Sequence, residues 1–174
     1  MLKKFLIAGT TIVGMALSSA AMADNGPSDM QIAHIAYTAG NIDIRYAHLA
    51  LAKSTNPAVR EFAQLMLQDH EAVNDQALAL LAKLGANPED NPTSQKLVAD
   101  ARRKLDELAN LHGVNFDRAY AANELAYHKF VNKTVEKTFI PSADNREFKS
   151  LLGEALQVFK IHQNHAAMMV NNLR

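Results

Sequence analysis

The 174-residue chain contains no cysteine. This absence excludes disulfide bonds, thiolate metal ligands, iron–sulfur clusters and the covalent attachment of c-type haem. The domain must therefore be stabilised by packing, and any metal ion must be held by histidine and carboxylate side chains.

Long apolar runs are missing from everything after the first 23 residues. That start contains two lysines, the apolar run FLIAGTTIVGMAL and an A-x-A pattern that ends at Ala23. This order is typical of a secretory signal sequence that is cleaved after Ala23. No later stretch is apolar enough to cross a membrane. We therefore expect residues 1–23 to be removed, and residues 24–174 to form one domain in a bacterial periplasm, with no integral membrane segment.

An excess of charge of either sign is also missing. The chain has 18 basic and 18 acidic residues, and the first 23 residues contain two lysines and no acid. Residues 24–174 therefore carry 16 basic against 18 acidic side chains. A net charge of −2 gives no electrostatic reason to expect nucleic acid or anionic lipid as a partner.

Apolar residues repeat at helical spacing over most of the chain, and no segment alternates as a strand. The sequence predicts four long helices and a shorter amphipathic one between the second and third of them. The long helices are expected at about 28–54, 56–85, 115–140 and 145–173, and the shorter helix at 92–112.

Capping residues, glycine and proline set the expected helix ends. Ser28 with Gln31 predicts a capping box at the start of the first helix. Asn56 before Pro57 is expected to cap the second helix and Gly85 to end it, and Asp144 or Asn145 to cap the last helix. Gly113 is expected to end the short helix just after His112. Asn115 is then expected to cap the third long helix, with Pro141 beyond its end.

The connections predict the architecture. Tight turns join the first long helix to the second and the third to the fourth, whereas about 30 residues separate these two pairs. Two tight pairs with one long crossover are typical of the ferritin-like variant of the four-helix bundle. The fold class expected is therefore all-α, a ferritin-like four-helix bundle with an extra short helix in the crossover.

Polar residues interrupt the apolar faces of all four long helices. In the stretch NELAYHKF, Glu124 and His128 lie on the face that the apolar residues mark as inward. Asp43, His70 and His162 lie on the inner faces of the other three helices, and all five are near the middle of their helices. Because mid-helix positions share one level in an antiparallel bundle, we expect these five side chains, here named the His–carboxylate cluster, to converge.

The chemistry of this cluster suits a metal ion. Imidazole and carboxylate groups together bind iron, zinc, copper or manganese. Unpaired carboxylates in a core would each cost roughly several kcal/mol, and a cation removes that cost. We therefore predict that the cluster binds a transition metal ion such as iron, copper or zinc. Tyr120 and Asn74 are expected to orient the imidazoles.

Other interpretations of the same residues stay open. The cluster residues also suit a metal-free hydrogen-bonded network that fixes helix register, or two histidines holding a non-covalent haem. His34 and His48 are expected on the surface, and His165 either as an outer ligand or on the surface. No serine is expected beside an inward histidine, so a serine hydrolase has no support.

Four segments, FAQLMLQDHEAVN, FDRAYAANELAYHKFV, IPSADNREFKSLL and HQNHA, carry a family resemblance. They resemble an exported bacterial family of the ferritin-like superfamily, domain of unknown function number 4142, over about residues 32–170. The resemblance implies a helical bundle in the periplasm or on the envelope, and the motif histidines would correspond to His70, His128 and His162. It implies no settled activity.

The pattern departs from that of ferritin-like di-iron proteins, which use Glu-x-x-His on two helices. Here bridging carboxylates are scarce, which favours a single metal ion, or none, over a di-iron centre. The function expected is metal handling or protection against envelope stress. The sequence assigns no catalytic residue and does not decide whether the protein is an enzyme.

Overall fold

The computed structural model describes residues 26–173, and these residues are all-α, with no strand among them. The expected signal sequence, residues 1–23, lies outside the described residues. None of the described helices combines the length and hydropathy needed to cross a membrane. The elements in order are α1 (Asp29–Lys53), α2 (Pro57–Lys83), α3 (Pro92–Ala109), α4 (Gly113–Thr134), a π-helical turn η1 (Val135–Phe139), α5 (Ile140–Ser142) and α6 (Arg146–Asn172).

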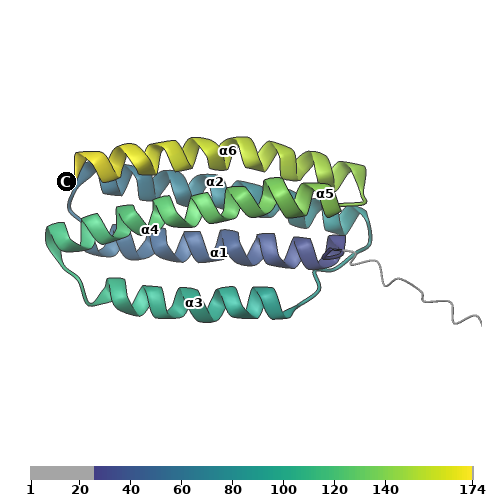
Figure 1. Ribbon diagram of the computed structural model, residues 1–174, viewed down its shortest axis with the longest axis horizontal. Helices are drawn as coiled ribbons and strands as arrows, with labels where there is room; N and C mark the ends of the chain where they lie inside the picture. Colours follow the sequence, from purple (N-terminus) through teal and green to yellow (C-terminus); the bar gives the residue numbers. More distant parts are fainter. Residues whose placement is uncertain (1–25, 174) are drawn as a thin grey trace, which may run out of the picture.

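The helices α1, α2, α4 and α6 lie lengthwise side by side, and α3 lies along the outside of α1 (Figure 1). Short connections make α1 antiparallel to α2, and α4 antiparallel to α6. Because α3 carries the chain back along the molecule, α2 and α4 run in the same direction (Figure 1). Contacts of α1 with α2 and α4, and of α6 with the same two helices, close a ring around a common core.

Several predicted helix ends are confirmed, and each depends on residues only a few positions apart. The Ser28–Gln31 capping box is present at the start of α1. The side chain of Asn56 accepts hydrogen bonds from the first turn of α2, and Asn145 does the same for α6. Gly85 takes a positive φ of 63° just past the end of α2, a conformation that glycine adopts without a steric penalty.

The ends of α3 and α4 differ from the prediction. The helix α3 ends at Ala109, not at His112, and α4 begins at Gly113 with His112 as its N-cap. Asn115 therefore lies in the first turn of α4 and does not cap it. Gly113 has a positive φ of 53°, so it provides the sharp change of direction between the two helices. Gly113 is the first residue of α4 and does not end α3.

Pro141 lies inside a helical segment, whereas the sequence placed it beyond the helix end. The chain continues from α4 through η1 into α5, which ends at Ser142. In a regular α-helix the ring of Pro141 would meet the carbonyl group of Lys137. The preceding π turn is wider, with the N–H of Ile140 bonded to the carbonyl oxygen of Val135, and it accommodates the proline.

The core consists of two apolar clusters with a polar layer between them. The first cluster includes Phe62, Phe116 and Tyr120, and the second includes Phe139 and Phe148. On each of the helices α1, α2, α4 and α6, members of the His–carboxylate cluster stand between residues of the two apolar clusters. The polar layer is therefore enclosed by apolar packing along the helix axes.

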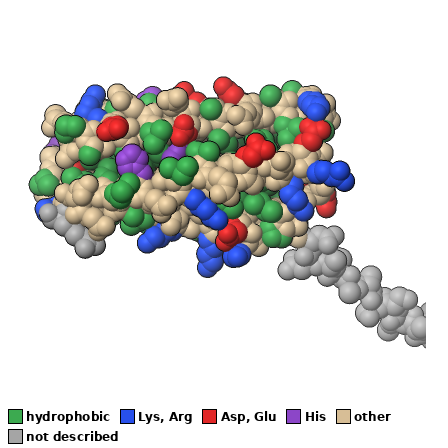
Figure 2. Space-filling model, turned by 90° about the horizontal axis from the view of Figure 1, so that it is seen from above, with side chains coloured by type: hydrophobic (Ala, Val, Ile, Leu, Met, Phe, Trp, Pro, Cys, Tyr) green, Lys and Arg blue, Asp and Glu red, His purple; other side chains and the backbone are tan. Residues whose placement is uncertain are grey.

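The face of the molecule seen from above matches the balanced composition of the sequence. Seen from above, acidic and basic side chains are interspersed with apolar and neutral ones (Figure 2). The face in this view carries no continuous patch of basic side chains among the residues shown in colour.

Candidate metal centre

The structure buries all five residues of the His–carboxylate cluster. Asp43 and Glu124 are 0% exposed, His128 and His162 are 1% exposed, and His70 is 3% exposed. Their ligand atoms form two overlapping groups in which all atoms lie within 4.8 Å of one another. One group is His70, His128 and His162, and the other is Asp43, Glu124 and His128. His128 belongs to both, so four helices meet at one centre.

Asp43 is the point at which α1 faces α2 and α4. Its Oδ2 atom is 3.2 Å from Nε2 of His70 and 3.4 Å from Nε2 of His128. Neither carboxylate oxygen of Asp43 makes an aligned hydrogen bond. The ring centroids of the three imidazoles are 5.4–5.8 Å apart. Asp43 therefore lies against two imidazoles without being satisfied by either of them.

Hydrogen bonds fix the tautomers of two imidazoles. Nδ1 of His128 is 3.0 Å from the backbone carbonyl oxygen of Glu124, which can only accept, so Nδ1 carries the hydrogen. Nε2 of His162 donates in the same way to Oδ2 of Asp69 at 2.8 Å. Nε2 of His128 and Nδ1 of His162 are then buried lone pairs without a partner. Metal binding needs imidazoles in this state.

Asp69 is a residue that the sequence analysis missed. Its carboxylate holds His162, in the manner of the carboxylate–histidine pairs that support metal ligands. The expectation that Tyr120 and Asn74 orient the imidazoles is wrong. The Tyr120 hydroxyl is buried without a partner, and the Asn74 amide packs against the backbone of α1.

Burial and neighbouring charges set the protonation of the cluster. Burial raises the pKa of Asp43, but His70 and His128 outweigh it and lower that pKa to about 2. Burial raises the pKa of Glu124 well above its ordinary value, and the charge of Asp43 raises it further. Burial lowers the pKa of His128, and it lowers the pKa of His162 to about 4 although Asp69 opposes it.

At neutral pH the cluster therefore holds an ionised Asp43 and two neutral imidazoles, those of His128 and His162, while burial and the charge of Asp43 favour the protonated form of Glu124. The attraction of an imidazole for Asp43 acts only while that imidazole is protonated, and His128 is not. An ionised Asp43 is therefore costly whenever the imidazoles beside it are neutral. A cation at the centre would supply the missing charge.

The unpaired hydrogen-bonding atoms also indicate that the cluster suits a cation. Nine buried side-chain nitrogen or oxygen atoms among the described residues have no hydrogen-bond partner, and seven of the nine belong to the His–carboxylate cluster. Native proteins leave few buried polar atoms unpaired. The donor set is three imidazoles and two carboxylates, which suits a transition metal better than the oxygen-seeking Mg²⁺ or Ca²⁺. The residues present thus fit a transition metal ion.

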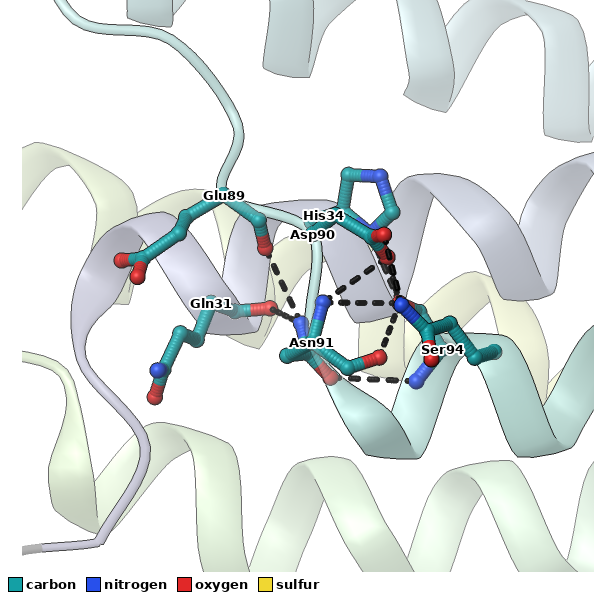
Figure 3. A network of polar contacts seen from close by, with 7 residues as sticks. Gln31, His34, Glu89, Asp90, Asn91 and Ser94 are labelled. Atoms are coloured by element: carbon teal, nitrogen blue, oxygen red, sulfur yellow. Dashed lines mark hydrogen bonds and ion pairs between the residues drawn. The ribbon is translucent and has the colours of Figure 1, made fainter.

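His34 takes part in a separate network. Its Nδ1 atom is 2.9 Å from the hydroxyl oxygen of Ser94, which donates to Asp90 at 3.0 Å (Figure 3). The Asn91 side chain accepts the backbone N–H of Ser94 and caps α3. His34 is therefore half-buried against α3, and not simply on the surface. Ser94 does stand beside a histidine, but its hydroxyl is engaged in holding the α2–α3 connection to α1.

The remaining histidines lie outside the cluster. His48 is exposed, as expected. His165 is half-buried and packs edge-on against Phe62, with ring centroids 5.4 Å apart. It belongs to neither group of ligand atoms.

Comparison with known proteins gives a family but no function. A family model described as "Domain of unknown function (DUF4142)" matches residues 14–169, which include the whole cluster. No curated protein and no solved structure matches the chain. The function must therefore be argued from the chemistry of the site.

Proposed function

Since the chain belongs to the DUF4142 family, whose description assigns no activity, we propose from the site itself that the protein binds one transition metal ion. The ligands would come from the His–carboxylate cluster: Asp43, His70, Glu124, His128 and His162. The observation that carries this proposal is the concentration of seven unpartnered buried polar atoms in these five side chains.

The protein's own residues prepare the centre. Asp43 supplies negative charge, while the bonds to Asp69 and to the Glu124 carbonyl group keep a lone pair free on His162 and His128. Glu124 must release its proton to become a ligand, so metal binding is coupled to proton release. A bound transition metal would supply Lewis-acid or redox chemistry at this point.

One ion fits better than two. Asp43 and Glu124 are the only carboxylates among the ligand atoms grouped at the centre in the described residues. Di-iron centres of helical bundles use four glutamates, two of them in Glu-x-x-His pairs. Here Glu124 and His128 are four residues apart, and the other histidines have no such glutamate.

We also assign the chain to the ferritin-like four-helix bundles. Two tight antiparallel pairs, joined by a long connection between helices that run in the same direction, support this assignment (Figure 1). Together with the predicted signal sequence at residues 1–23, it supports a periplasmic protein that handles metal ions or protects the envelope against stress.

Metal content tests the proposal. Residues 24–174, purified without an affinity tag and offered iron, copper, zinc or manganese, are expected to hold about one ion per chain. Changing His70 and His162 together to Ala should abolish this uptake. The matched control is His48→Ala, an exposed histidine, which should leave uptake unchanged. Wild-type protein that takes up none of these ions, or a double variant that keeps its ion, would contradict the proposal.

A metal-free network is the second candidate. The contacts of Asp43 with His70 and His128, at 3.2 and 3.4 Å, favour it, because protonation of either imidazole would make an ion pair. In that case the double variant should lose stability while no added metal changes the melting temperature of the wild type.

A further inference from the structure

An apolar cavity of about 80 Å³ lies beside the His–carboxylate cluster. Asp43, His70 and His128 stand at one end of its lining. The rest of the lining comes from the four long helices, α3 and η1, and it includes Val73, Val131, Val135, Leu152 and Ala155. The cavity therefore extends from the cluster into the second apolar half of the core.

The unpartnered polar atoms of the cluster face one another and not the cavity. The ligand atoms of each group lie within 4.8 Å of one another, whereas the surface of the cavity is almost entirely apolar. A buried water molecule needs about two to four polar partners, and this surface does not offer them. The cavity therefore favours an apolar occupant over water.

The volume of the cavity limits the occupant to a very small molecule. In another protein, an engineered apolar cavity of about 150 Å³ holds one benzene molecule or xenon. The present cavity has roughly half that volume. A benzene-sized ring is therefore too large for it, whereas a diatomic gas molecule fits.

The lining reaches the surface between α3 and α4. Thr93 of α3 and Phe130 of α4 both line the cavity, and both are exposed. The helix α3 packs mainly against α1 and touches α4 little. Exposed side chains change rotamer within nanoseconds, so a diatomic molecule can enter here without displacement of a helix.

Dioxygen is a small apolar molecule with a use at this place. Iron and copper, two of the metals that the cluster suits, are metals of dioxygen chemistry in proteins. We propose that the cavity binds dioxygen and holds it beside the His–carboxylate cluster. The binding depends on the cavity alone, and only a use for the bound dioxygen rests on the proposed metal function.

Dioxygen itself is the probe, because it is paramagnetic and accelerates the relaxation of nuclei close to it. Val135 and Leu152 line the cavity and are buried. Val59 and Leu108 are matched controls of the same residue types, equally buried but outside the lining. In chelator-treated protein, a change from nitrogen to dioxygen pressure should accelerate methyl relaxation several-fold more at Val135 and Leu152 than at the controls. Equal acceleration at all four residues would overturn the proposal.

Variants that fill the cavity test its location. Ala155→Leu and Ala77→Leu each add bulk to the lining from a different helix, and either should abolish the excess relaxation at Val135 and Leu152. Ala82→Leu makes the same change at an exposed position of α2 outside the lining, and should leave the excess unchanged. A melting curve shows which variants are folded, and a folded filling variant that keeps the full excess would contradict the proposal. If neither filling variant folds, the comparison of the four residues in the wild type decides.

Because chelator is present, the relaxation measurement succeeds or fails independently of the metal proposal. Metal uptake without excess relaxation would contradict only the dioxygen site. Excess relaxation without metal uptake would contradict only the proposed metal function.

Discussion

Replacement of Asp43 by Asn separates the metal site from the metal-free network. The change keeps the size and shape of the side chain but removes the one ionised carboxylate of the cluster. Asp43 faces His70 and His128 through Oδ2, and it has no aligned hydrogen bond to lose. The two candidate functions therefore predict different effects of the same substitution.

The size of the effect follows from linkage. Metal at about 100 times its Kd stabilises the folded state by about 2.7 kcal/mol. For a domain of this length, each kcal/mol corresponds to about 2–4 °C, so the wild type should gain about 5–11 °C. Loss of a supporting residue weakens metal binding by about 10–100-fold, and loss of a direct ligand should reach the upper end. At the same metal concentration the Asp43→Asn variant would then gain about 0.4 kcal/mol, or about 1 °C.

The assay is a pair of melting curves, one with metal and one with chelator. With chelator, Asp43→Asn should melt within a few degrees of the wild type, because no aligned hydrogen bond is broken. The matched control is Asp117→Asn, which changes a buried carboxylate outside the cluster that accepts from Ser54 at 2.5 Å. It should lower both melting temperatures and leave the metal-induced difference unchanged.

Two results would refute the reasoning about Asp43. One is a full metal-induced shift in the Asp43→Asn variant. The other is a large loss in chelator, since breaking a buried ion pair costs about 3–5 kcal/mol and would indicate the network.

Three other substitutions test particular contacts. The raised pKa of Glu124 favours folding only at low pH, because above about pH 4 the unfolded chain ionises this residue before the folded chain does. Glu124→Gln should therefore raise the free energy of unfolding of chelator-treated protein relative to the wild type, by up to about 1.4 kcal/mol per pH unit while Glu124 is ionised only in the unfolded state. Urea unfolding at several pH values measures this difference. A difference independent of pH would contradict it. Asp69→Ala should weaken metal binding about 10–100-fold in a metal titration, because His162 loses its orienting partner, and unchanged affinity would show that Asp69 does not support the site. Gly40→Ala should lower the melting temperature despite a helix-propensity gain of about 1 kcal/mol, because the new Cβ would lie 2.5 Å from Oδ1 of Asn74. Adding Asn74→Ala should restore the melting temperature. A single Gly40→Ala variant that is more stable than the wild type would refute the contact.

Interactions between residues close in sequence were predictable. The capping box of Ser28, the N-cap at Asn56 and the glycine at position 85 are confirmed, because each depends on groups within one or two helical turns. The all-α class follows from apolar periodicity in the same way. The depth of the His–carboxylate cluster along the helices could also be predicted from the sequence. Inward residues near the middle of each long helix must lie at similar depth when the helices are antiparallel.

The sequence by itself thus determined the helices, most of their ends and the depth of the five polar side chains, while the tertiary structure decided the rest. The orientation of Asp69 toward His162 depends on how α2 packs against α6. The helical segment continues through Pro141 because of the π turn η1, in which Val135 and Phe139 are buried in the second apolar cluster. The cavity beside the cluster is the space that side chains from separate helices leave unfilled. Local hydrogen bonds and periodicity act over a few residues, whereas these features arise only when distant segments come into contact.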